Sequence, residues 1–258
     1  MSPSTQAGTV VLVHGAWADG SCWSSIIVPL RRQGLHVVSA PIPLTSLTDD
    51  SVALRRVIER VDGPVILAGH AYAGAVIAAV HDDRVKSLVY VAALAPDLGE
   101  TVAEVFYRTA PHAKAPALSP DAHGLIWMPE NGFADAVAHK ASPDQIVISA
   151  AVQRPIAVNC IQEKAPVPAW KTTPSWYLIA EEDRMIAPEN QRFMANRMRA
   201  VVRSHAVDHT PMYTAPDLVV DLISEAARAA FANYGGSPIG VERRATAKWL
   251  FISRAPSE

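Results

Sequence analysis

Cysteine is scarce in this sequence: Cys22 and Cys160 are the only two among 258 residues. They match neither the spacing of a metal site nor a C-x-x-C redox pair, and two cysteines do not make a disulfide framework. We interpret both as small buried apolar residues and expect no metal and no other cofactor. Because 50% of the residues are hydrophobic, the chain can form one large core without such support.

The sequence also lacks an excess of charge of one sign, with a formal net charge of −2 and a pI near 6.5. This balance disfavours the basic surfaces that bind nucleic acid or anionic membranes. No apolar run approaches the roughly 20 residues of a membrane span, and the first residues lack the pattern of a secretion signal. We therefore expect a cytoplasmic protein with no nucleic-acid or membrane partner, and leave a homodimer open.

Short apolar runs alternate with helix-length segments along most of the chain. The runs predict buried strands at residues 9–13, 36–40, 65–68, 85–93, 176–180 and 201–205. Apolar residues at helical spacing predict helices at 51–61, 190–199 and 217–231. This order is typical of an α/β fold in which helices flank a mostly parallel central sheet.

Residues 96–173 interrupt this alternation, and we refer to them as the insertion. They are rich in proline, contain apolar helical pieces and show no obvious core strand, so we interpret them as a helical cap on a core of residues 1–95 and 174–232. Ligands of parallel sheets bind at the carboxyl ends of the strands, where such a cap could cover them. Residues 233–258 do not continue the pattern, and we interpret them as a C-terminal extension of unknown role.

The turn after the third predicted strand reads Gly-His-Ala-Tyr-Ala-Gly at residues 69–74. Small residues two positions before and after Ala71 are typical of a nucleophile elbow, a sharp strand-to-helix turn that points its central side chain into an active site. The sequence thus has alanine where an elbow carries its nucleophile.

Two polar residues follow later predicted strands, Asp183 after 176–180 and His209 after 201–205. A loop acid can orient a histidine, and the histidine can then act as general base. The order elbow, acid, base is the one expected for a hydrolase with this elbow. Glu181 and Glu182 compete with Asp183 for the role of the acid, because successive acids often form only a solvated loop.

Backbone N–H groups near the elbow predict an oxyanion hole. In this type of enzyme one donor comes from the loop after the first strand and the other from the residue after the nucleophile. These positions hold Ala16 and Tyr72. We expect the adjoining substrate pocket to be lined by apolar and aromatic residues, namely Trp17, His70, Phe106, Trp127 and Met128, with Tyr107 and Phe133 also in the covering insertion.

The chain resembles α/β-hydrolases of the plant methylesterase and hydroxynitrile-lyase branch, which has many bacterial esterase relatives. The matching motifs are VLVHGAW at 11–17, GHAYAG at 69–74, VAALAPD at 91–97, EDRMIAP at 182–188 and DHTPM at 208–212. The resemblance implies an α/β-hydrolase fold over about residues 8–231. It also implies a triad with Ala71 in the serine position, Asp183 as acid and His209 as base.

Two positions distinguish the lyases of this branch from its ester hydrolases. Its lyases have a lysine directly after the catalytic histidine and a hydroxyl residue directly after the histidine of the first loop. Thr210 and Gly15 stand there instead, so the resemblance favours ester hydrolysis over cyanohydrin cleavage.

The resemblance implies a serine carboxylesterase that hydrolyses small to medium apolar esters through an acyl-enzyme. A methyl group cannot attack a carbonyl, so we expect the chain with Ala71 to be an inactivated variant. The alternative is a natural non-catalytic homologue that binds a small hydrophobic ligand. A hydroxynitrile-lyase-like enzyme is the less favoured third hypothesis.

Overall fold

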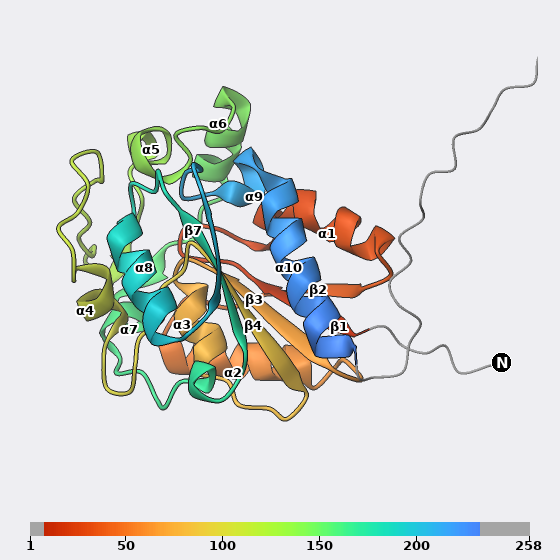
Figure 1. Ribbon diagram of the computed structural model, residues 1–258. Helices are drawn as coiled ribbons and strands as arrows, with labels where there is room; N and C mark the ends of the chain where they lie inside the picture. The colour runs from red at the N-terminus through yellow and green to blue at the C-terminus, as the bar shows by residue number, and fades with distance from the viewer. Residues whose placement is uncertain (1–7, 233–258) are drawn as a thin grey trace, which may run out of the picture.

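A parallel sheet of six strands forms the centre of the computed structural model, which describes residues 8–232 (Figure 1). The strand order is β2-β1-β3-β4-β7-β8. The strands are β1 (Thr9–Val13), β2 (His36–Ala40), β3 (Val65–His70), β4 (Val85–Val91), β7 (Ser175–Ala180) and β8 (Val201–His205). The predicted α/β fold with a parallel sheet is confirmed, whereas the predicted extension at 233–258 lies outside the described residues.

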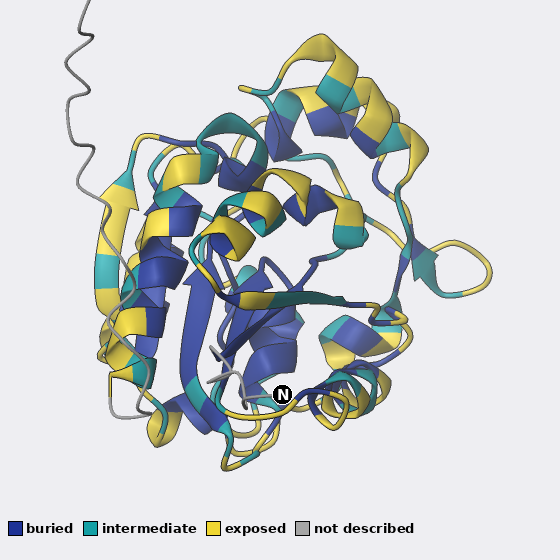
Figure 2. Cartoon of the chain, turned by 90° about the vertical axis from the view of Figure 1, so that its right-hand side faces the viewer, coloured by how far each residue is buried: buried dark blue, intermediate teal, exposed yellow. Residues whose placement is uncertain are grey.

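Helices cover both faces of the sheet (Figure 1). The helices α1 (Ser24–Arg32) and α10 (Pro216–Phe231) pack on one face, and α2 (Leu47–Ile58), α3 (Ala73–Ala78) and α8 (Pro188–Arg197) pack on the other. Because strand side chains alternate between faces, Val11 and Val13 join the core under α2 and α3, while Val10 and Leu12 join the core under α1 and α10. Figure 2 shows the resulting pattern, with buried central strands inside helices whose outer surfaces are exposed.

Some predicted boundaries were wrong by a few residues. The strand predicted to end at residue 93 ends at Val91, because Ala92 adopts a positive φ of 44° and leaves the extended conformation. The helix predicted from residue 51 begins at Leu47, because the Ser46 hydroxyl caps it by accepting a hydrogen bond from the N–H of Asp49 at 2.9 Å.

The insertion adds no strand to the six-stranded sheet. It contains α4 (Val102–Phe106), α5 (Glu130–Gly132), a π-helical turn (Phe133–Val137), α6 (Pro143–Ala151), α7 (Val158–Gln162) and a 3₁₀ turn (Ala169–Lys171). Its β5 (Leu125–Ile126) and β6 (Ile156–Ala157) pair with each other in antiparallel fashion. In Figure 1, α5 and α6 lie at the top of the molecule, next to α9 (Pro211–Thr214), and α4 and α7 lie at one side.

Several polar contacts fix the insertion to the loop before α2. The N–H of Ala157 donates to the carbonyl of Leu44 at 3.0 Å, and the Arg154 guanidinium donates to the carbonyl of Ile42 at 2.9 Å. On the other side, the indole N–H of Trp17 donates to the carbonyl of Ile126 at 3.0 Å. These bonds join the insertion to the segments that follow the carboxyl ends of β1 and β2. No helix within residues 8–232 is long and apolar enough to cross a membrane.

Candidate active site

Ala71 lies directly after β3 in a strained backbone conformation. Its φ of 50° is in the left-handed region, which is unfavourable for residues other than glycine. Hydrogen bonds hold it there: its N–H donates to the carbonyl of Val91 at 3.3 Å, and its carbonyl accepts from the N–H of Leu94 at 2.9 Å. The backbone therefore has the sharp turn of an elbow, although the side chain is only a methyl group.

Glycines around Ala71 are explained by close contacts. A Cβ atom on Gly69 would lie 2.7 Å from the carbonyl oxygen of Ala73, and one on Gly74 would lie 2.3 Å from that of Leu94. Real Cβ atoms do not approach so closely, so the tight packing of strand against helix requires these glycines. A Cβ atom on Gly15 would lie 3.0 Å from the Cβ of Ala71, which leaves little space there for a larger residue.

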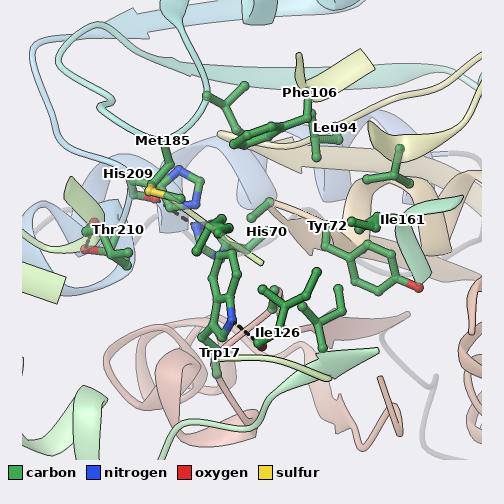
Figure 3. A pocket seen from close by; sticks show the side chains of 18 of the residues that line it. Trp17, His70, Tyr72, Leu94, Phe106, Ile126, Ile161, Met185, His209 and Thr210 are labelled. Atoms are coloured by element: carbon green, nitrogen blue, oxygen red, sulfur yellow. Dashed lines mark hydrogen bonds between the residues drawn. The ribbon is translucent and has the colours of Figure 1, made fainter. Parts of the chain in front are cut away.

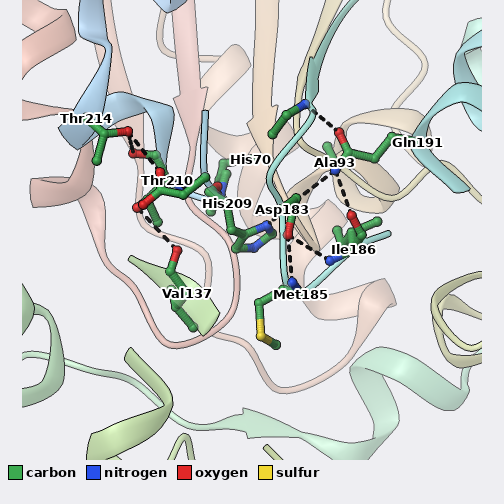
Figure 4. A network of polar contacts seen from close by, with 12 residues as sticks. His70, Ala93, Val137, Asp183, Met185, Ile186, Gln191, His209, Thr210 and Thr214 are labelled. Carbon is green, nitrogen blue, oxygen red and sulfur yellow. Dashed lines mark hydrogen bonds and ion pairs between the residues drawn. The ribbon is translucent and has the colours of Figure 1, made fainter. Parts of the chain in front are cut away.

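Asp183 and His209 form a buried hydrogen-bonded pair (Figure 4). The distance between His209 Nδ1 and Asp183 Oδ2 is 2.7 Å. Oδ2 also accepts from the amide of Gln191 at 2.8 Å, and Oδ1 accepts from the N–H groups of Met185 and Ile186 at 2.7 and 2.9 Å. Four donors thus fix the carboxylate, and it in turn fixes the imidazole with its proton on Nδ1.

The neighbouring acids have other partners. Glu181 forms an ion pair with Arg192, and Glu182 forms one with Lys140 at 2.6 Å. Of the three consecutive acids, Asp183 alone contacts His209 within residues 8–232. Asp183 is therefore the buried acid beside His209, whereas Glu181 and Glu182 lie near the surface.

The backbone on both sides of His209 is also fixed. His70 Nε2 donates to the carbonyl of His209 at 2.8 Å, and burial lowers the pKa of His70 to about 3, so its ring is neutral. On the other side, the buried Asp208 carboxylate accepts from the N–H groups of Lys140 and Thr210 at 3.0 and 3.2 Å. Lys140 belongs to the insertion, so the insertion helps to hold the loop that carries His209.

Ala71 and His209 border the same cavity, which has a volume of about 300 Å³ (Figure 3). Ala16 and Tyr72 border it as well, and neither backbone N–H donates a hydrogen bond to another group within the described part of the chain. The cavity thus brings together an imidazole, two unengaged N–H groups and the methyl group of the elbow. Such an arrangement can remove a proton and stabilise an oxyanion, but it offers no side-chain nucleophile at residue 71.

The lining of the cavity contains no Asp, Glu, Lys or Arg among the described residues that border it. The polar side chains there are those of Trp17, Cys22, His70, Tyr72, Tyr107, Ser149, Gln162, His209, Thr210 and Tyr213. No group of three or more His, Cys, Asp or Glu residues that could hold a metal ion occurs within residues 8–232.

The structure places the predicted pocket residues in two groups. Trp17, His70 and Phe106 line the cavity, whereas Trp127 and Met128 do not. The side chain of Trp127 is 49% exposed and donates to Asp121 at 3.2 Å. Ile126, the residue before it, lines the cavity, and successive side chains of an extended segment point to opposite sides. Met128 is buried in a small apolar cluster behind the cavity wall. Tyr107 and Phe133, which were also expected in the cover, line the cavity, and Ile161 of the insertion does so as well.

Residues 10–222 match a family model described as the alpha/beta hydrolase family. The chain belongs to this family. The resemblance that its motifs indicate is therefore confirmed, and the hydrolase fold accounts for the elbow and for the loops beyond β7 and β8.

Curated relatives and solved structures agree with this assignment. The chain is 24% identical over 253 residues to Methylesterase 2 of Arabidopsis thaliana, covering 86% of this chain and 96% of that protein. It is 25% identical over 252 residues to a pyrethroid hydrolase of Sphingobium wenxiniae, covering 85% and 88%. The crystal structure of polyneuridine aldehyde esterase superposes with a TM-score of 0.75 at 17% identity, covering 85% of this chain and 99% of that one. The homologues are thus esterases and related hydrolases.

Sequence reasoning missed two polar residues of this hydrolase. Gln191 lies on the buried side of α8 and joins Asp183 to the carbonyl of Ile186 at 2.8 Å. Asp50, in the first turns of α2, accepts a hydrogen bond from the hydroxyl of Tyr72 at 2.7 Å. Both residues lie in register with the apolar residues of their helices, but the sequence does not show whether a polar residue there is buried with a partner or solvated.

Proposed function

We propose that this chain is a serine-type carboxylic ester hydrolase in which alanine occupies the position of the nucleophile. The observation that carries the proposal is the 2.7 Å Asp183–His209 pair, whose histidine borders the same cavity as Ala71 at the centre of an elbow. The esterase names of the relatives support the same reaction class.

The proposed reaction requires a serine at residue 71. Its hydroxyl would attack the ester carbonyl while His209 accepts the proton at Nε2, and the N–H groups of Ala16 and Tyr72 would bind the oxyanion. His209 would then protonate the departing alcohol, and a water molecule activated by His209 would release the acid and free the serine. With Ala71 the covalent step has no nucleophile, so the chain would bind the ester and leave it intact.

The cavity favours neutral substrates. A carboxylate or an ammonium group would lose its hydration in this cavity without meeting an opposite charge, and this desolvation is costly. A volume of about 300 Å³ suits a small to medium ester. We therefore propose an uncharged, mainly apolar ester as the substrate.

Restoring the serine tests the proposal. We expect Ala71→Ser to raise turnover of p-nitrophenyl butyrate by up to about 10⁶-fold, by analogy with proteases that lose their nucleophile. An ester of similar size with a free carboxylate should be hydrolysed much more slowly by the same variant. A folded Ala71→Ser protein without activity on neutral esters would refute the proposal.

Ala71 itself favours a second candidate function, a non-catalytic protein that binds a small hydrophobic ligand. Both candidates predict that a neutral ester raises the melting temperature of the chain with Ala71, because ligands that bind the folded state stabilise it. The two candidates predict different results for Ala71→Ser, because only the ester hydrolase should then hydrolyse the ester efficiently.

Two features weigh against cyanohydrin cleavage. The space beside Gly15 is limited by Ala71 and by the carbonyl of His70, so a hydroxyl-bearing residue there would be crowded. At residue 210, the threonine hydroxyl donates to the carbonyl of Val137 at 3.3 Å and supplies no positive charge.

A further inference from the structure

A buried carboxylate that the proposed reaction does not use lies behind the elbow. The Asp50 side chain is fully buried; its Oδ1 accepts from the N–H of Leu44 and its Oδ2 from the hydroxyl of Tyr72, each at 2.7 Å. The thiol of Cys160 lies 3.7 Å from Oδ2. Burial raises the pKa of Tyr72 well above its ordinary value, so the phenol keeps its proton and acts as the donor.

Tyr72 has two ends with different surroundings. Its backbone N–H is one of the two proposed oxyanion donors, and its hydroxyl points away from His209 towards Asp50 (Figure 3). The residue before it is Ala71, with its strained φ of 50°. Such strain persists only where the surroundings enforce it, so the conformation of the elbow depends on the contacts around it. Rotation of the peptide between residues 71 and 72 would turn the N–H of Tyr72 away from the cavity.

Asp50 is itself firmly held. Its partner Leu44 belongs to the loop on which the insertion docks, through the 3.0 Å bond from the N–H of Ala157. Cys160 lies in α7, and its neighbours Val158 and Ile161 line the cavity. The carboxylate therefore connects the elbow to the loop before α2 and to the part of the insertion that forms a cavity wall.

We propose that Asp50 and Tyr72 are positioning residues: their hydrogen bond keeps the N–H of Tyr72 directed at the oxyanion of the reacting ester. This inference rests on the proposed function, because it concerns a donor of the proposed oxyanion hole. It predicts an uneven response to two conservative substitutions. Phenylalanine at residue 72 removes the bond and keeps the ring and the N–H. Asparagine at residue 50 can keep it, with its oxygen accepting from Leu44 and its amide donating to the Tyr72 oxygen.

The kinetic test uses the Ala71→Ser protein and p-nitrophenyl butyrate. Adding Tyr72→Phe should lower kcat roughly tenfold and change KM less than about twofold, because a misdirected donor weakens transition-state binding more than substrate binding. Adding Asp50→Asn should cause a clearly smaller loss. Asp49→Asn, an exposed neighbour, and Tyr90→Phe, a buried tyrosine outside the cavity, serve as controls and should leave kcat within about twofold. A kcat unaffected by Tyr72→Phe, or lowered equally by Tyr90→Phe, would overturn the proposal.

A second measurement does not depend on activity. In the chain with Ala71, ¹⁵N relaxation of the backbone amides of residues 71–73 should show added motion after Tyr72→Phe and little after Asp50→Asn. Unchanged relaxation after Tyr72→Phe would refute the positioning role even if the Ala71→Ser enzyme is active. If that enzyme is inactive, the proposed function fails, and the relaxation data alone decide whether the hydrogen bond holds the elbow.

Discussion

The two sides of the cavity keep their geometry by different means. On the acid–base side, formed by Asp183, Gln191 and His209, side chains hold one another through a chain of hydrogen bonds. On the elbow side, formed by Ala71 and Tyr72, the turn depends mainly on backbone hydrogen bonds and on neighbouring glycines, with one side-chain bond from Tyr72 to Asp50. The side chain at residue 71 contributes little to this turn. A single side chain can therefore differ there while the rest of the site keeps its form.

The largest expected effect comes from a substitution on the acid–base side of the cavity. In the Ala71→Ser protein, Asp183→Asn should lower kcat about 10⁴-fold with little change in ester binding. An asparagine amide that donates to Nδ1 forces the imidazole proton onto Nε2, where it can no longer accept the serine proton. Steady-state kinetics on p-nitrophenyl butyrate would measure this loss.

Glu182→Gln is the matched control for that substitution, because Glu182 is the neighbouring acid and pairs with Lys140. It should leave kcat nearly unchanged. If it lowered kcat as much as Asp183→Asn does, Asp183 would not be the acid of the site.

A substitution on the elbow side is expected to have a smaller effect, on stability. Gly74→Ala should lower the free energy of unfolding by about 3 kcal/mol, because the new Cβ would have to displace backbone at the carbonyl of Leu94. Urea unfolding of the chain with Ala71 would measure it. Gly99→Ala is a useful control: its Cβ meets no atom within 4 Å, so only its positive φ of 79° adds a cost, of about 1 kcal/mol. Equal losses in the two variants would show that the elbow is not tightly packed.

The third effect concerns His70, which lies between the two sides. Its folded-state pKa of about 3 lies below the ordinary 6.5, so as the pH falls below 6.5 the unfolded chain takes up the proton first. The stability that this residue contributes is therefore complete above pH 6.5 and decreases towards pH 3 by about 1.4 kcal/mol per pH unit.

Urea unfolding at pH 7 and pH 5 tests this dependence. His70→Asn should reduce the stability difference between the two pH values by about 2 kcal/mol. An unchanged difference in His70→Asn would mean that His70 takes up a proton in the folded chain.

The sequence allowed the sheet and its flanking helices to be predicted, because buried parallel strands are continuous apolar runs and helices repeat every 3.6 residues. It also allowed Asp183 and His209 to be proposed as partners, since loops after parallel strands converge at one edge of the sheet. The structure brings these two side chains together at 2.7 Å.

Residues whose orientation depends on tertiary packing could not be predicted. Gln191 and Asp50 are polar residues in helices, and local sequence does not distinguish an inward polar side chain from a solvated one. Trp127 and Met128 were expected in the cavity because they are large and apolar, but they do not line it. Phe106, Tyr107 and Phe133 were expected for the same reason and do line it, so composition indicated the apolar cover without giving the orientation of each residue.

The described lining of the cavity, which contains no Asp, Glu, Lys or Arg, also bears on how a reaction there would end. Hydrolysis of a neutral ester yields a carboxylic acid, which loses its proton near neutral pH. Within the described lining no lysine or arginine would hold the resulting anion, and water hydrates it far better than this cavity does. The same surface that admits the ester would disfavour the acid, so product inhibition by the acid should be weak.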